Sequence, residues 1–200
     1  MAIVVTGFGP FGEHSTNASW EGVRLVPELW GRRQPPVRVE QIPVQYSWVQ
    51  GEEEARWREA IFTVHVGVSS RDSVVTLESQ AHNTGYCTPD TQARCPEGGC
   101  CVAGGPEIAG TCLDMARLLE LVRGQAGAQS GLQFQQSEDP GRFLCDFVYY
   151  RSLHSSGGRS LFVHVPPLGK PYSKEQLGEA LVAILGAVVR MVGEQEEQRV

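Results

Sequence analysis

Three side chains that could act together in catalysis stand near the ends of short apolar segments in this 200-residue chain. Glu78 closes the segment VVTLE, His164 lies near the end of LFVHV, and Cys145 follows the turn SEDPG. In an open α/β sheet, the carboxyl ends of the strands gather such residues around one crevice. A cysteine nucleophile works with a histidine that shares its proton, and often with a carboxylate that orients the imidazole ring. Cys145, His164 and Glu78 would fill these roles in that order.

We expect Cys145 in the first turn of a helix, because Leu144, Phe147, Val148 and Leu153 fit one apolar helical face. The helix dipole and the unpaired backbone N–H groups there favour a thiolate and could stabilise an oxyanion. Purely structural roles remain open at this point. A cysteine in an apolar segment is commonly a small core residue, a histidine in a buried strand is usually hydrogen-bonded, and a glutamate that ends a strand is normally solvated.

Short β-branched segments alternate with helical ones along the whole chain, which is typical of an α/β sheet. The apolar runs IVV and LFVHV lack strict polar alternation, as expected for strands that helices cover on both faces. With 41% hydrophobic residues and no linker, the chain is expected to form one domain. The six expected strands are residues 2–7, 37–44, 62–68, 73–78, 132–137 and 160–165.

Two helices have recognisable beginnings. Asn17 can cap a helix whose length Pro27 limits, and Ser173 with Gln176 forms a capping box for the C-terminal helix. That helix should bury one apolar face and end before residues 193–200, GEQEEQRV, which we expect to be a frayed tail. Its apolar face consists of Leu177, Leu181, Ile184, Leu185 and Val188.

The sequence between these two helices contains one more amphipathic helix and one long connection. Residues 111–123, TCLDMARLLELVR, have the spacing of a helix. Residues 79–110 are rich in glycine and cysteine, and a connection of that length is usually functional or mobile.

Charge and the N-terminal residues exclude some classes of protein. The net charge is −6 with scattered lysines and arginines, so we expect no nucleic-acid partner. The apolar run before Thr6 is too short for a secretory signal or a membrane span, which predicts a cytoplasmic protein without a membrane partner. In a reducing cytosol, the six cysteines would be free thiols, metal ligands or a nucleophile rather than a disulfide framework.

Five cysteines lie apart from Cys145 in one stretch of the sequence. They contain no C-x-x-C pair, so a zinc site is only weakly indicated, although His82 is near enough in sequence to join one. We therefore expect no metal. These cysteines are Cys87, Cys95, Cys100, Cys101 and Cys112.

The glycine-rich segment GFGPFG, residues 7–12, matches the letters of a dinucleotide-binding loop. Phe8, Pro10 and Phe11 leave little room for a close approach of phosphate to the backbone. A pocket lined by phenylalanine, or plain core packing, explains the segment better.

The motifs TGFGPFG, NASW, TLESQAHNTGY, GRFLCDFVYY and FVHVPPLGKPY together resemble the pyroglutamyl-peptidase I family, in its order and spacing over nearly the whole chain. Within that family the motifs look closest to its 1-like branch. The resemblance implies a cysteine peptidase that removes an N-terminal pyroglutamyl residue from peptides. It also implies a single domain over residues 1–200, an α/β/α sandwich with a mostly parallel central sheet, and no cofactor.

The resemblance also assigns roles to residues. The family's catalytic triad falls on Glu78, Cys145 and His164, and the two aromatic residues that hold the lactam ring fall on Phe8 and Phe11. A third pocket residue, two positions before the nucleophile, falls on Phe143. A neutral, flat lactam suits such a site, because it carries no charged amine to bury among aromatic rings.

Several departures from the family pattern leave a second interpretation open. Pro140–Gly141 replaces an Ala-Gly pair before the nucleophile, SRDS stands at 70–73, and Asp90–Thr91 replaces Asp-Asn. The segment GEEEARWREA, residues 51–60, is shorter and more polar than the expected helix. These differences motivate the alternative of a catalytically silent relative that binds peptides or partners through the same cleft.

Overall fold

The computed structural model describes residues 1–11, 16–51, 57–69 and 73–197 and is built around one six-stranded sheet. The strand order is β2-β1-β3-β8-β4-β7, and every expected strand of the sequence lies in this sheet. The bounds are β1 Ile3–Phe8, β2 Val37–Ile42, β3 Phe62–Val68, β4 Val75–Glu78, β7 Phe134–Ser137 and β8 Ser160–Val165.

The direction of the strands changes once across the sheet. Strands β2, β1, β3 and β8 are parallel to one another. Strand β4 pairs antiparallel with β8, and β7 pairs parallel with β4, so these two strands run opposite to the other four. The sheet is therefore mostly parallel, as the sequence predicts, with a reversal at the β8–β4 boundary.

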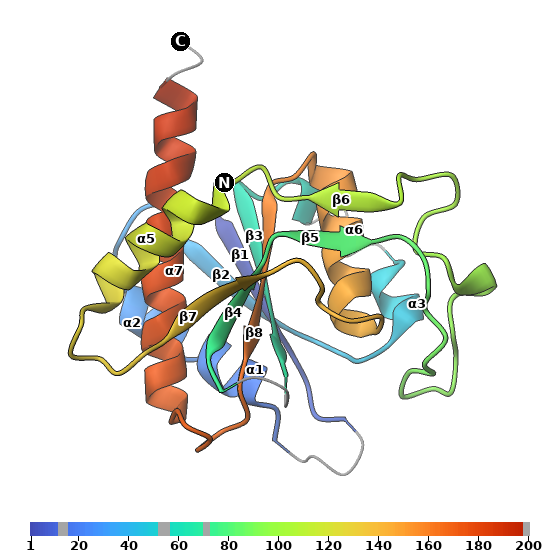
Figure 1. The fold of residues 1–200 in the computed structure, drawn as a ribbon, viewed down its shortest axis with the longest axis horizontal. Helices are drawn as coiled ribbons and strands as arrows, with labels where there is room; N and C mark the ends of the chain where they lie inside the picture. The colour runs from blue at the N-terminus through green and yellow to red at the C-terminus, as the bar shows by residue number, and fades with distance from the viewer. Residues whose placement is uncertain (12–15, 52–56, 70–72, 198–200) are drawn as a thin grey trace.

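Helices cover both faces of the sheet and make three layers (Figure 1). One face carries α1 Ala18–Val23, α2 Val26–Trp30, α5 Met115–Ala126 and α7 Lys174–Glu197. The other face carries α3 Tyr46–Val49 and α6 Leu144–Ser156. Each face has its own cluster of buried apolar side chains, which explains why the central strands are mostly apolar and lack strict polar alternation.

The expected helix caps are present. Asn17 Oδ1 accepts a hydrogen bond from Ser19 N at the start of α1, and Pro27 stands at the start of α2, where a proline is tolerated. Ser173 Oγ accepts from Gln176 N while Gln176 Oε1 accepts from Ser173 N, so the capping box before α7 is confirmed. The predicted apolar face of α7 is buried.

Two helix boundaries differ from the predictions. Helix α5 begins at Met115 instead of near residue 111, because the Asp114 side chain accepts from Arg117 N and caps the helix there. Helix α7 continues to Glu197, so the prediction of a frayed tail is wrong for residues 193–197, and residues 198–200 lie outside the described residues. Glu194 forms ion pairs with Arg117 of α5 and Arg190 of α7, which hold this last part of the helix.

The long connection after Glu78 contains structure that the sequence did not indicate. Strands β5 Gln80–His82 and β6 Ile108–Gly110 form a separate antiparallel pair that packs on α6 (Figure 1). Between them lies the short 3-10 turn Glu97–Gly99. Three-residue strands are too short to show a period in the sequence.

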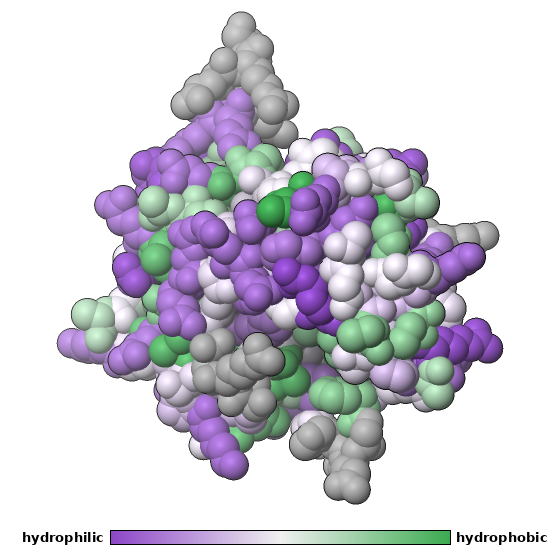
Figure 2. All heavy atoms as spheres, turned by 45° about the vertical axis from the view of Figure 1, so that its right-hand side comes forward, coloured by the Kyte–Doolittle hydropathy of each residue, from purple (hydrophilic) through white to green (hydrophobic). Residues whose placement is uncertain are grey.

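Helix α7 is long and apolar, and its segment Lys174–Gln195 could cross a membrane by length and composition. However, 56% of its most apolar window is buried inside the protein, as in the core helix of a folded domain. The face shown in Figure 2 is mostly polar, with apolar side chains in small separate patches. Residues 70–72 and 52–56, which carry most of two departures from the family pattern, lie outside the described residues.

Candidate active site

Glu78 and His164 meet across the boundary where the sheet reverses direction. Thr76 stands opposite His164 and Glu78 stands opposite Phe162, so Glu78 and His164 are diagonal neighbours on one face of the β4–β8 pair. Glu78 Oε1 lies 2.8 Å from His164 Nδ1, and both side chains are buried. The expectation that all three reactive residues stand at carboxyl ends on one edge of the sheet is wrong, because β4 and β7 run the other way. Antiparallel register, rather than a shared edge, brings the carboxylate to the imidazole.

The charge of His164 is stabilised by its two neighbours. Burial lowers the pKa of the imidazole, but the charges and hydrogen bonds of Cys145 and Glu78 outweigh burial and raise the pKa to about 10. His164 is therefore an imidazolium at neutral pH. With Nδ1 donating to Glu78, its Nε2 is the ring nitrogen left for Cys145 and a substrate.

Cys145 is the second residue of α6, as predicted from the sequence. The first backbone hydrogen bond into this helix runs from Phe147 N to Phe143 O, and the preceding N–H groups of Leu144, Cys145 and Asp146 have no partner among the described residues. These groups and the helix dipole stabilise negative charge on the thiolate or on an oxyanion beside it. Cys145 and His164 line the same cavity, and the charge of Cys145 is the largest of the influences that raise the pKa of His164, so the structure brings the sequence-predicted triad together.

Gly67 of β3 makes room for the thiol. A Cβ atom at this position would lie 2.8 Å from Cys145 Sγ and 2.7 Å from Phe162 Cζ. Both distances are shorter than any ordinary contact, so only glycine permits the observed position of Cys145. A glycine inside the strand segment FTVHVGV was the sequence signal for this close approach.

We expect Gly67→Ala to lower kcat/KM by about 10²-fold, because a displacement of the thiol by a fraction of an ångström misaligns it with His164. Steady-state kinetics on the substrate that the family resemblance implies measures the loss. The control is Gly124→Ala in α5, where an added Cβ contacts nothing within 4 Å. The same drop in both variants would show that the effect is not local to Cys145.

The turn before the nucleophile accommodates Pro140 without disturbing α6. Gly141 has a φ of 89°, a conformation that favours glycine, and proline followed by such a glycine is typical of a type II turn. The Gly141 N–H donates to Asp139 Oδ1 at 3.1 Å, and the Asp139 N–H donates to Ser137 Oγ. The N–H that Pro140 lacks is therefore not needed to position Cys145.

We expect Pro140→Ala to leave kcat/KM within about twofold of wild type and to reduce the free energy of unfolding by about 0.4–1 kcal/mol, since proline restricts the unfolded chain. Chemical denaturation together with an activity assay measures both quantities. A large gain in activity would show that Pro140 impairs the site.

A small apolar cavity of about 70 Å³ adjoins the thiol. Its walls include Phe8, Phe11 and Phe143, the three residues predicted to line a lactam pocket, together with Cys145. Ser19 Oγ accepts from Phe8 N, and Asn17 Nδ2 donates to Gly9 O, so the start of α1 fixes the segment that carries Phe8. The phenylalanine segment thus forms a pocket wall; Gly12, the third glycine of the motif, lies outside the described residues.

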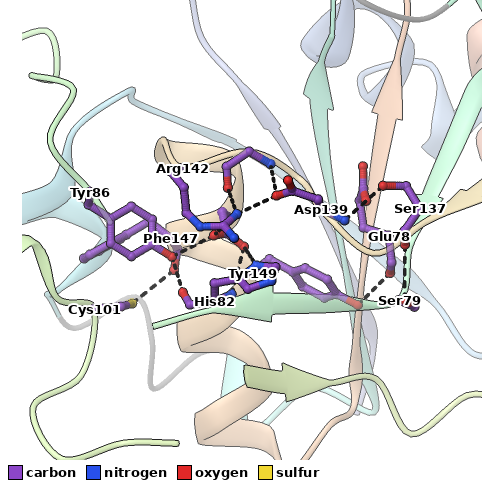
Figure 3. Close-up of polar contacts among 12 residues, drawn as sticks. Glu78, Ser79, His82, Tyr86, Cys101, Ser137, Asp139, Arg142, Phe147 and Tyr149 are labelled. Atoms are coloured by element: carbon purple, nitrogen blue, oxygen red, sulfur yellow. Dashed lines mark hydrogen bonds and ion pairs between the residues drawn. The ribbon is translucent and has the colours of Figure 1, made fainter. Parts of the chain in front are cut away.

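Asp146, which the sequence analysis did not single out, ties the start of α6 to the long connection. The carboxyl is fully buried and accepts hydrogen bonds from His82 N at 3.0 Å and Tyr86 Oη at 3.1 Å, and Arg142 Nη1 lies 3.4 Å away. Burial outweighs these contacts and raises its pKa to about 7. Figure 3 shows His82, Tyr86 and Arg142 converging beside α6. An acidic residue in a first helical turn is normally exposed, so the sequence carried no signal for this role.

The thiols of Cys95, Cys100 and Cys101 each contact a backbone carbonyl oxygen. Cys101 Sγ is buried and lies 3.5 Å from Phe147 O, and Cys95 Sγ lies 3.4 Å from Cys87 O. In the described part of the chain, no three His, Cys, Asp or Glu side chains are grouped to hold a metal ion. His82 uses its backbone N–H to bind Asp146.

The chain is similar to known peptidases in sequence. The family model described as pyroglutamyl peptidase PgaPase_1 matches residues 36–169. Pyroglutamyl-peptidase 1 of Homo sapiens is 45% identical over 197 residues, which cover 98% of this chain and 93% of the relative. The identity is 31% with the human pyroglutamyl-peptidase 1-like protein, over 78% of this chain and 79% of the relative.

Solved structures agree with the sequence comparison. Pyrrolidone carboxyl peptidase of Thermus thermophilus has a TM-score of 0.78 at 27% identity, over 92% of this chain and 98% of that one. Pyroglutamyl peptidase I of Bacillus amyloliquefaciens has a TM-score of 0.79 at 25% identity, over 96% and 97%. With a matching family model, extensive identity and a shared fold, this chain belongs to the pyroglutamyl-peptidase I family of cysteine peptidases.

Proposed function

We propose that this protein hydrolyses the bond between an N-terminal pyroglutamyl residue and the rest of a peptide. The observation that carries the proposal is that Cys145, His164 and Glu78 line one cavity, with His164 bound to Glu78, beside a small pocket lined by phenylalanine. The first part supplies a nucleophile with an acid, and the second part fits a small uncharged ring. Relatives named pyroglutamyl-peptidase 1 support the same reaction.

In the proposed reaction, the thiolate of Cys145 attacks the carbonyl carbon of the pyroglutamyl group and forms a tetrahedral intermediate. Backbone N–H groups at the start of α6 stabilise the oxyanion. The C–N bond then breaks, and His164 Nε2 donates its proton to the leaving amine, which leaves a thioester on Cys145. Water attacks the thioester with His164 as general base, and pyroglutamate leaves as the thiolate and imidazolium are restored.

Glu78 acts through His164 in this scheme. Its carboxylate accepts from Nδ1–H, which fixes the ring orientation and stabilises the imidazolium between proton transfers. No cofactor takes part in any step.

The experiment compares a pyroglutamyl peptide with the same peptide that begins with proline. We expect pyroglutamate release from the first and none from the second, because the prolyl amine is charged and would lose its hydration among Phe8, Phe11 and Phe143. Chromatography of the products measures both. Equal cleavage of the two peptides, or cleavage of neither, would contradict the proposal.

The alternative of a silent peptide-binding relative has lost its main motivation, because Pro140 fits its turn and α6 begins where the nucleophile needs it. We also propose that the enzyme acts in the cytoplasm, since catalysis requires Cys145 as a reduced thiol and a reducing compartment maintains it.

A further inference from the structure

Two cavities of different size meet at Cys145. The small phenylalanine-lined cavity is described above, and a second cavity of about 410 Å³ also has Cys145 in its wall. Phe143, Val68 and Cys145 line both. The larger volume is within the range of ordinary ligand sites and exceeds what the lactam ring needs.

His164 decides which cavity receives the leaving part of the substrate. The imidazole lines the large cavity and is not part of the wall of the small one. Because His164 must donate a proton to the leaving amine, that nitrogen and the residue attached to it lie on the side of the large cavity. A third cavity next to Phe11 and Leu168 includes neither Cys145 nor His164 in its wall, so it does not receive the leaving amine.

We propose that the large cavity binds the residue that follows the pyroglutamyl group, and that Asp139 makes this subsite prefer a basic residue over an acidic one. The inference rests on the proposed function and adds a subsite and a specificity-determining residue to it.

Asp139 presents a charged oxygen that is available to a ligand. Its side chain is 68% exposed at the mouth of the cavity, and the Arg142 guanidinium outweighs partial burial and keeps the pKa of the carboxyl below its usual range. Both hydrogen bonds that its side chain accepts from the described residues, from Gly141 N and Arg142 Nη1, use Oδ1. Oδ2 accepts no hydrogen bond from the described residues.

Arg142, the other charge at this mouth, already has partners inside the protein. Nη1 lies 2.5 Å from Asp139 Oδ1, donates to Gly141 O at 2.7 Å and lies 3.4 Å from Asp146 Oδ2 (Figure 3). One guanidinium therefore faces two carboxyl groups, and its side chain is only 35% exposed. Asp139 Oδ2 is the acceptor that remains at the mouth, and it can bind the donor groups of a lysine or arginine side chain but not the carboxylate of a glutamate or aspartate side chain.

The geometry of Asp139 is fixed before a substrate binds. Pro140 restricts the backbone next to it, and the bonds from Gly141 and Arg142 hold Oδ1. Little side-chain entropy is then lost on binding, so a single exposed carboxylate can discriminate between charges.

The test uses C-terminally amidated peptides with lysine, glutamine or glutamate after the pyroglutamyl residue. We expect wild type to favour the lysyl peptide over the glutamyl peptide by about fivefold in kcat/KM at low salt, a ratio that high salt reduces. Asp139→Asn, which keeps an oxygen for Gly141 and Arg142, should bring this ratio to about twofold or less. Glu138→Gln is the matched control, since Glu138 is the adjacent exposed acid and does not line the cavity, and its ratio should equal that of wild type.

A wild-type ratio near one, a preference for glutamate, or equal changes in Asp139→Asn and Glu138→Gln would overturn the inference. Failure to cleave even the glutaminyl peptide would instead overturn the proposed function. In that case, calorimetric Kd values of the Cys145→Ala protein for the lysyl and glutamyl peptides decide the inference. Tighter binding of the lysyl peptide supports it, and equal affinities or no binding contradict it.

Discussion

Replacement of Cys145 by alanine should reduce the release of pyroglutamate by roughly 10³-fold or more. The variant keeps the small phenylalanine-lined cavity and the Glu78–His164 pair but has no atom that can form the thioester. The loss should therefore appear in kcat, while the affinity for a pyroglutamyl peptide stays close to that of wild type. Single-turnover and binding measurements separate the two quantities.

Cys112→Ala is the matched control for this substitution. Cys112 is exposed and lines neither cavity at the site, so its replacement should leave turnover unchanged. Similar thermal unfolding of the two variants would show that both are folded. Substantial turnover by Cys145→Ala would exclude Cys145 as the nucleophile.

Glu78→Gln should lower kcat/KM by roughly 10²- to 10⁴-fold, because the neutral amide no longer stabilises the imidazolium of His164. Glutamine also introduces a donor. If the amide NH₂ group takes the position of Oε1, it faces the Nδ1–H of His164, which is also a donor. If it takes the position of Oε2, it is buried without a hydrogen-bond partner among the described residues.

The pH dependence distinguishes this electrostatic role of Glu78 from simple disruption of the fold. In wild type, the imidazolium persists until the pH rises through about 10, where the alkaline limb of activity should lie. Without the carboxylate, the limb should move to lower pH by about 1 unit or more. An unchanged limb in the folded variant would contradict the role assigned to Glu78.

The stability of the folded protein should also depend on the protonation of His164. The pKa of His164 is raised on folding from 6.5 to about 10, so its contribution is fully present below pH 6.5 and is lost as the pH rises through about 10. The difference in Tm between wild type and Glu78→Gln should therefore be larger at pH 6 than at pH 10.

Much of this protein follows from local sequence. The six sheet strands are short β-branched runs, Asn17 and Ser173 cap helices as their positions predict, and Cys145 stands in the first turn of α6. These features depend on residues within one or two turns of each other, where side-chain periodicity and capping preferences act directly. The sequence motifs also indicated the family, because all five occur in this chain in the family's order.

Tertiary structure alone decided how these parts meet. A strand has the same alternation of side chains in either direction, so the sequence could not show that β4 and β7 run against the other strands. That reversal sets Glu78 diagonally across from His164 and places Asp139 at the mouth of the large cavity. The burial of Asp146 likewise depends on Tyr86 and His82, about 60 residues earlier, because only folding brings their donors to its carboxyl.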